Sequence, residues 1–235
     1  FLRLQYERLN KQTVVDLEWL IFDDSPEPSP FFTKLDDPRV GYLYSGQRVS
    51  IGEKRNILVQ NAAAPVIAQF DDDDYYRGDY LETMLNLLEE GFDFVKLSGW
   101  FVYQCQLNLF GYWNLHDVDS LCQDWFPSKQ PCVANLTPEQ KKNMALNYLG
   151  YGFSYVFTKA FSLKYPFPPL NFGEDTPVAL AAQKKAAFKH VLDEKGLVLH
   201  IIHLNNTSRC FPQYRLPSFA LKKFFPDIPN DFIST

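Results

Sequence analysis

Short apolar runs alternate with amphipathic stretches in the first part of the chain. Three runs, at residues 17–22, 40–44 and 65–70, end at turn or acidic residues, which is typical of buried strands. Stretches with apolar residues at helical spacing lie at residues 2–11, 53–64 and 79–90. Strands that alternate with helices indicate βαβ units. The pattern therefore predicts an α/β protein with a mostly parallel sheet flanked by helices.

The second half of the chain is less regular. Strands are predicted at residues 92–97, 100–103, 155–157 and 197–203, and a helix at residues 176–189, with Pro177 at the first helical position and a preceding carboxylate as cap. Residues 107–140 are aromatic and irregular, so we interpret them as a functional loop region. We divide the chain into a main domain, residues 1–208, and a tail rich in proline and phenylalanine, residues 209–235, packed on the domain or at an interface.

Composition and charge narrow the classes of function. The 235 residues are 46% hydrophobic and 22% charged, as in an ordinary globular protein. A net charge of −5 argues against a protein that binds nucleic acid through its phosphates, and no apolar run is long enough to predict a transmembrane segment. The four cysteines include no C-x-x-C pair, so we interpret them as reduced thiols and predict a cytoplasmic location.

Residues 71–74 are four adjacent aspartates at the end of a predicted strand. Two carboxylates in contact repel each other by about 4 kcal/mol at an effective dielectric constant of about 20. Full solvation or a bound cation relieves this repulsion, so a solvated acidic turn is one interpretation. The position favours the other, because open α/β sheets bind ligands at the carboxyl ends of their strands. Oxygen ligands of this kind suit Mg²⁺ or Mn²⁺.

Two further acidic features follow the same logic. Asp23 and Asp24 come directly after the strand at residues 17–22, so their carboxylates are expected at the same rim of the sheet, unless they only form a turn. Glu174 and Asp175 precede the helix predicted from residue 176. Taken alone, Asp175 reads as an ordinary helix cap.

Five motifs in order change this interpretation. They are DLEWLIFDDS at residues 16–25, GEKRN at 52–56, PVIAQFDDDDYY at 65–76, PFPPLNFGED at 166–175 and HLNNTS at 203–208. Together they resemble the family 2 glycosyltransferases of the Rossmann-like GT-A fold, which transfer a sugar from a nucleotide-sugar donor. The resemblance covers residues 1–208. Because that family's domain opens with a strand before its first helix, and this chain begins inside what resembles the helix, the first strand is expected to be missing.

The resemblance implies a divalent cation, Mn²⁺ or Mg²⁺, and a donor sugar linked to a nucleoside diphosphate, by family habit UDP. Asp71 and Asp73 match the metal ligands, and His203 matches a late histidine that approaches the metal or the diphosphate. Residues that match contacts to the nucleotide are Asp23 and Asp24 for the base and ribose, Asp72 for the ribose, and Arg55 and Asn56 near the donor.

For catalysis, Asp175 matches the general base of the family, and Glu174 a residue that orients the base or the acceptor. Sugar transfer needs a carboxylate to take the proton of the acceptor hydroxyl, and a Lewis acid to stabilise the leaving diphosphate. A base on the far side of the anomeric carbon gives direct displacement with inversion. The acceptor is implied to be a hydroxyl of a glycan or of another molecule.

Two other functions stay open at this point, a nucleotidyltransferase that makes sugar nucleotides and a non-catalytic carbohydrate-binding relative. The histidines outside the motifs are given structural roles. His200 and His203, three residues apart in a predicted strand, are expected to point to opposite faces, with His200 in the core. His116 and His190 have no partner at metal-ligand spacing and are expected at the surface.

Overall fold

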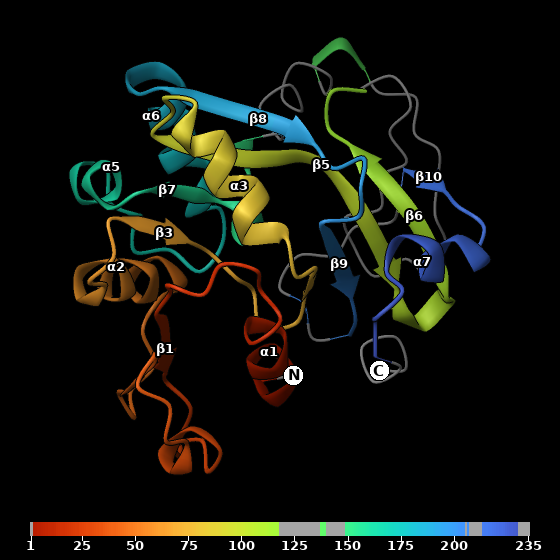
Figure 1. The fold of residues 1–235 in the computed structure, drawn as a ribbon. Coiled ribbons are helices and arrows are strands. Elements are labelled where there is room, and N and C mark those ends of the chain that lie inside the picture. The colour runs from red at the N-terminus through yellow and green to blue at the C-terminus, as the bar shows by residue number, and fades with distance from the viewer. Residues whose placement is uncertain (1, 118–136, 140–148, 205, 207–212, 230–235) are drawn as a thin grey trace.

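Helices and strands alternate through most of the chain in a computed structural model that describes residues 2–117, 137–139, 149–204, 206 and 213–229 (Figure 1). The helices are α1 (Leu2–Leu9), α2 (Ile51–Asn61), α3 (Tyr80–Glu89), α5 (Lys159–Lys164), α6 (Asp175–Lys185) and α7 (Phe219–Phe224), with 3₁₀ turns at Phe32–Lys34, Cys105–Leu107 and Gly152–Ser154. The strands are β1 (Trp19–Asp23), β2 (Val40–Tyr44), β3 (Val66–Ala68), β4 (Tyr75–Tyr76), β5 (Phe94–Gln104), β6 (Leu109–Asn114), β7 (Val156–Thr158), β8 (Phe188–Leu192), β9 (Val198–Ile202) and β10 (Tyr214–Arg215).

The long strand β5 organises the main sheet, which has eight strands among the described residues. It pairs parallel with β8 and β9, and antiparallel with β6 and β7. The three other pairings in this sheet, β3 with β7, β4 with β9 and β10 with β6, are also antiparallel. The expectation of a mostly parallel sheet is therefore wrong in this detail. One reason is that the short link between β5 and β6 cannot make the crossover that a parallel pair needs.

Strands β1 and β2 form a separate parallel pair, in register from Trp19 with Val40 to Asp23 with Tyr44. Among the described residues, β1 pairs only with β2, and β3 pairs only with β7, so each keeps one edge without a strand partner. The missing first strand stays a prediction.

Three elements differ from the sequence prediction. The strands expected at residues 92–97 and 100–103 are one strand, β5, whose pairing with β8 is irregular between Leu97 and Gly99. Strand β6 lies in the region expected to be irregular. Helix α6 ends at Lys185, because the segment that follows pairs with β5 as strand β8. Alanine-rich sequence favours helix there, and tertiary pairing overrides that preference.

The start of α6 also differs in detail. Pro177 is the third residue of the helix, and Glu174 at the cap position makes no side-chain capping hydrogen bond. The Glu174 carboxylate is therefore available for other contacts.

Aromatic side chains fill the core on both sides of β5. In the described part of the tail, Ala220, Leu221 and Phe225 are buried in a cluster with Phe101 and Phe110, so α7 packs on the main sheet. The boundary at residue 208 stays a prediction.

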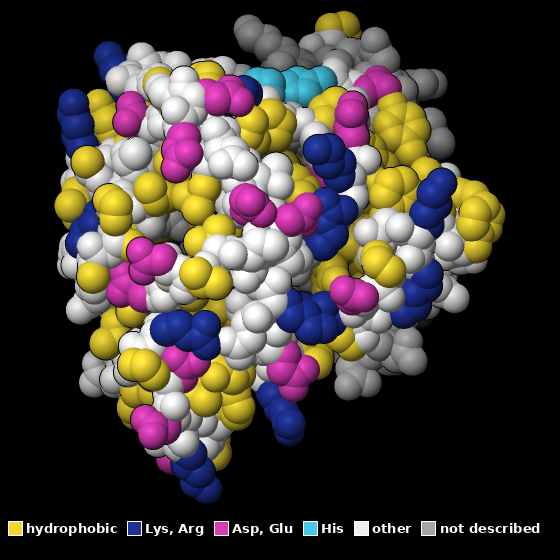
Figure 2. Space-filling view, viewed as in Figure 1, with side chains coloured by type: hydrophobic (Ala, Val, Ile, Leu, Met, Phe, Trp, Pro, Cys, Tyr) yellow, Lys and Arg dark blue, Asp and Glu magenta, His cyan; other side chains and the backbone are white. Residues whose placement is uncertain are grey.

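None of the described helices is long and apolar enough to cross a membrane. Figure 2 shows acidic and basic side chains interspersed over one face of the molecule. Three of the four cysteines lie outside the described residues, so their reduced state stays a prediction.

Candidate active site

A cleft of about 1090 Å³ opens between β1, α2, the turn after β3 and the start of α6. It brings together most of the residues singled out in the sequence. Those that line it are Asp23, Asp24, Arg55, Asp71, Asp72, Asp73, Glu174 and Asp175. Two do not line it, Asn56 and His203. The three acidic features of the sequence thus lie on one concave surface.

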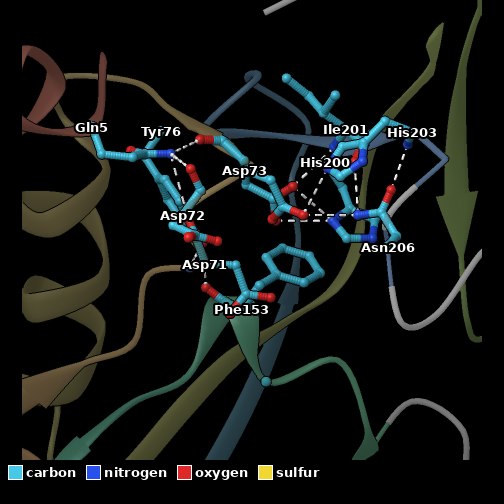
Figure 3. Close-up of polar contacts among 12 residues, drawn as sticks. Gln5, Asp71, Asp72, Asp73, Tyr76, Phe153, His200, Ile201, His203 and Asn206 are labelled. Carbon is cyan, nitrogen blue, oxygen red and sulfur yellow. Dashed lines mark hydrogen bonds and ion pairs between the residues drawn. The ribbon is translucent and has the colours of Figure 1, made fainter. Parts of the chain in front are cut away.

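Residues 71–74, called the acidic turn below, border this cleft through Asp71, Asp72 and Asp73, and residues from other segments hold the turn in place (Figure 3). The Gln5 amide of α1 donates to the backbone carbonyls of Asp71, Asp72 and Asp74. The Tyr76 hydroxyl accepts from the Asp71 N–H at 3.0 Å and donates to the Phe153 carbonyl at 2.9 Å. These contacts fix the backbone of the turn without using its carboxylates.

The carboxylates of the acidic turn crowd together. Ligand oxygens of Asp71, Asp73 and Asp74 all lie within 4.8 Å of one another, which suits a divalent cation. Burial in the cleft wall and the neighbouring carboxylates raise the pKa of Asp71 to about 6 and that of Asp73 to about 8. The geometry of the donor set therefore fits the predicted metal, with Asp71 and Asp73 facing the cleft.

The hydrogen bonds of Asp73 leave one oxygen for a ligand. Its Oδ2 accepts from the Asn206 amide at 2.9 Å and lies 3.1 Å from His203 Nε2. Its Oδ1 has no hydrogen bond to the described residues. His203 thus contacts the predicted metal ligand Asp73, and its own role as a metal ligand stays a prediction.

The raised pKa values predict a pH dependence with a definite sign. A carboxyl whose pKa is higher in the folded state binds more protons folded than unfolded, so the metal-free protein should lose stability as the pH rises from about 4 to about 8. Burial lowers the pKa of His200, but the Asp74 carboxylate outweighs this and raises it to about 9, so its contribution is also lost as the pH rises.

The measurement is the melting temperature of the protein from about pH 5 to about pH 8, with EDTA and with Mg²⁺. We expect a steady fall with EDTA and a smaller fall with Mg²⁺, because the cation replaces the bound protons. A melting temperature that rises with pH in EDTA would contradict the crowding of these carboxylates.

Arg55 links the acidic turn to the start of α6. Its guanidinium forms an ion pair with Glu174 at 2.6 Å and lies 3.9 Å from Asp71. It also packs over the Phe167 ring, and a Cβ added at Gly152 would lie 2.7 Å from its Nη1. Glu174 is 6% exposed and points its carboxylate at Arg55, so the arginine holds together two acidic segments that are about a hundred residues apart in sequence.

Asn56 supports the site from behind. Its side-chain amide donates to the Phe167 carbonyl at 2.8 Å and its Oδ1 accepts from the Phe167 N–H at 2.9 Å. These contacts do not fit the predicted contact with the nucleotide, because both polar groups of the side chain are used outside the cleft. The same loop packs closely on α2, where a Cβ at Gly52 would lie 1.8 Å from the Pro168 carbonyl oxygen.

Asp175 begins α6 and is held by three donors. Its Oδ2 accepts from the Gly152 N–H at 3.0 Å, and its Oδ1 accepts from the N–H and the hydroxyl of Thr176 at 2.7 and 3.3 Å. The carboxylate is only partly buried and lines the cleft, so its remaining lone pairs can reach a ligand there. The role of Asp175 as general base stays a prediction.

Asp23 and Asp24 lie at the other end of the cleft. Asp23 accepts from the Tyr42 hydroxyl at 2.5 Å and from the Ser25 and Ser29 N–H groups. Burial alone would raise the pKa of Asp23, and these hydrogen bonds outweigh it and lower the pKa. Asp24 pairs with Lys54 at 2.6 Å. Contacts of these two aspartates with a nucleotide stay a prediction.

The histidines are arranged differently from the sequence prediction. His200 and His203 both contact the acidic turn, at Asp74 and Asp73, because β9 ends at Ile202 and strand alternation no longer applies to His203. His116 and His190, expected as separate surface residues, lie side by side with 3.1 Å between Nε2 and Nδ1, and Figure 2 shows histidine side chains together at the surface.

Sequence reasoning missed several cleft residues. Lys54 stands next to Arg55 inside the GEKRN motif, so its position was the available signal. Gln5 and Asn206 reach the acidic turn from α1 and from beyond β9. Asn206 stands inside the HLNNTS motif, which was the available signal, whereas no local pattern marks Gln5.

Comparison with known proteins places the chain in a family. The sequence model of Glycosyl transferase family 2 matches residues 2–146, more than half of the chain. The chain belongs to glycosyl transferase family 2. The match confirms the family inferred from the five motifs. Three of those motifs lie inside the matched region, and those at residues 166–175 and 203–208 lie beyond it. No curated protein sequence matches the chain significantly.

Solved structures of TarS from S. aureus share the fold. TarS 1-349 in complex with UDP-GlcNAc superimposes with a TM-score of 0.61 at 16% identity, over 88% of this chain and 56% of that one. The complex with UDP gives a TM-score of 0.56 at 15% identity, over 84% and 55%. This glycosyl transferase family 2 chain therefore spans about half the length of TarS 1-349. The family match and these neighbours confirm the predicted α/β class of GT-A type.

Proposed function

We propose that this chain is a metal-dependent, inverting glycosyltransferase that moves a sugar from a UDP-linked donor to a hydroxyl of a glycan or another acceptor. Membership of family 2 supports sugar transfer over the nucleotidyltransferase and the non-catalytic alternatives. The fold neighbours were solved with UDP and with UDP-GlcNAc, which supports a uridine nucleotide as the donor.

The proposal of metal dependence rests on the net charge of the side chains that line the cleft. Among the residues that the structure describes, seven carboxylates line the cleft, and the basic side chains that line it are Lys54, Arg55 and His200; the carboxylates are Asp23, Asp24, Asp71, Asp72, Asp73, Glu174 and Asp175. Lys54 and Arg55 are already paired with Asp24 and Glu174. A diphosphate adds further negative charge, so it can bind here only if a cation offsets the repulsion. Asp71 and Asp73 would hold that cation, which as a Lewis acid stabilises the leaving diphosphate.

Asp175 lines the same cleft as Asp71 and Asp73, and Arg55 contacts Asp71 and Glu174, the neighbour of Asp175. In the proposed reaction the Asp175 carboxylate takes the proton of the acceptor hydroxyl. The hydroxyl oxygen forms the new bond to the anomeric carbon while the bond to the nucleoside diphosphate breaks on the opposite face. The product sugar is therefore inverted. Glu174 keeps Arg55 in place beside this reaction centre.

A thermal-shift experiment tests the proposal with UDP, UDP-GlcNAc and GDP as ligands, each with Mn²⁺ and with EDTA. A ligand at about a hundred times its Kd adds about 2.7 kcal/mol to the free energy of unfolding, which is readily detected. We expect UDP compounds to raise the melting temperature only when Mn²⁺ is present. An equal shift in EDTA would refute metal dependence, and no shift with any nucleotide would refute the donor class.

A further inference from the structure

Asp74 differs from the other three aspartates of the acidic turn. It is fully buried, whereas Asp71 and Asp73 are half-buried and line the cleft. Both of its carboxylate oxygens lie 2.9 Å from Nδ1 of His200, and its Oδ1 also accepts from the Ile201 N–H at 2.9 Å (Figure 3). The carboxylate of Asp74 is therefore directed at β9, away from the cleft.

His200 completes this link. Its ring stacks on Phe153, with 4.8 Å between centroids and an angle of 9° between planes. Phe153 in turn accepts the hydrogen bond of Tyr76, the residue that binds the Asp71 N–H. The pair of Asp74 and His200 thus joins the acidic turn to β9 and to the segment that carries Gly152.

The crowding of Asp71, Asp73 and Asp74 allows a competing interpretation, in which all three bind the cation. Hydrogen bonding argues against it for Asp74. Its Oδ1 already has two donors and its Oδ2 faces His200. A cation bound to Asp74 would compete with the buried His200 ring for the Asp74 carboxylate. Asp73, by contrast, uses only Oδ2 for hydrogen bonds to the described residues.

We propose that Asp74 and His200 are positioning residues for the metal site: they do not bind the cation, and they hold the acidic turn so that Asp71 and Asp73 face the cleft. The proposal rests on the proposed function, because it concerns the cation that the function requires. Residues that orient metal ligands typically change metal affinity by about 10 to 100-fold when they are replaced.

The test is Mn²⁺ affinity in the presence of UDP, measured by electron paramagnetic resonance on the wild type and on Asp74→Asn, His200→Leu, the double variant and Asp73→Asn. Water-proton relaxation then counts the waters on bound Mn²⁺. We expect each single replacement in the pair to weaken Mn²⁺ binding by about 10 to 100-fold without changing the number of waters. The double variant should be no weaker than the singles, because both break one interaction. Asp73→Asn should change the number of waters.

His200→Asn serves as the conservative rescue, because its amide can donate from near the position of Nδ1. It should bind Mn²⁺ close to the wild-type level. If His200→Leu does not fold, the test compares Asp74→Asn with His200→Asn. Melting temperatures in EDTA show whether any loss comes from unfolding alone. An added water on Mn²⁺ in Asp74→Asn, with His200→Leu unaffected, makes Asp74 a ligand and overturns the inference while the proposed function stands. Wild-type affinity in both single variants also overturns it. Failure of the wild type to bind Mn²⁺ with UDP refutes the proposed function itself.

Discussion

Replacement of Asp175 by Asn is expected to abolish sugar transfer while leaving donor binding intact. An amide cannot take the proton of an acceptor hydroxyl, and loss of a general base typically lowers the rate by about 10² to 10⁴-fold. The assay is release of UDP from UDP-GlcNAc, or from the nucleotide sugar with the larger thermal shift, in the presence of hydroxyl acceptors. The Kd for UDP with Mn²⁺ should stay close to that of the wild type, because Asp175 is not among the residues proposed to bind the nucleotide or the cation.

The experiment must distinguish the loss of the proposed base from a loss of folding stability in the Asp175 variant. In the wild type the Asp175 carboxylate accepts from Gly152 and Thr176, and an amide can keep only one of these two backbone contacts as an acceptor. The orphaned N–H costs about 1 to 3 kcal/mol of stability, so the melting temperature must be recorded. Glu89→Gln, which removes an exposed carboxylate at the end of α3, is the matched control and should behave as the wild type. Normal turnover in the Asp175 variant removes this residue from the role of base.

Replacement of Asp73 by Asn is expected to have opposite effects on ligand binding and on stability. The thermal shift given by UDP with Mn²⁺, about 2.7 kcal/mol in free energy at a hundred times the Kd, should fall close to zero, because the ligand oxygen loses its charge. The metal-free variant should melt at a higher temperature than the metal-free wild type near neutral pH. Burial and the neighbouring carboxylates raise the pKa of Asp73 to about 8, and a neutral amide removes that repulsion.

The matched control is Asp16→Asn, which removes one negative charge at an exposed position that does not line the cleft. It should leave both the metal-dependent shift and the metal-free melting temperature unchanged. A retained UDP shift in the Asp73 variant would show that the cation binds elsewhere, and a lower metal-free melting temperature would show that this carboxylate stabilises the fold.

Local pattern was enough for the elements that depend on their own residues. Strand β2 has the bounds that the apolar run at residues 40–44 indicated. The helices α1, α2 and α3 each begin within two residues of the predicted start. The sequence pattern gave a wrong prediction where pairing with a distant strand determines the local structure. Residues 188 and 189 were expected to end the predicted helix, but they belong to strand β8, which pairs with β5. The mixture of parallel and antiparallel strand pairs could not be predicted from the sequence either, because strand direction depends on the connections between strands and not on composition.

By itself, the sequence determined the family and the chemical types at the site: four adjacent aspartates, an arginine in GEKRN and the acidic pair before α6. These follow from residue identity and order, which the chain carries directly. Only the tertiary structure decided which carboxylates face the cleft and which is buried. Asp73 and Asp74 are neighbours of the same type, yet one faces the cleft and the other is buried against His200, since that choice depends on β9, more than a hundred residues away. Likewise, the side chain of Asn56 forms a hydrogen bond with the loop at Phe167, a contact that no local sequence spacing predicts.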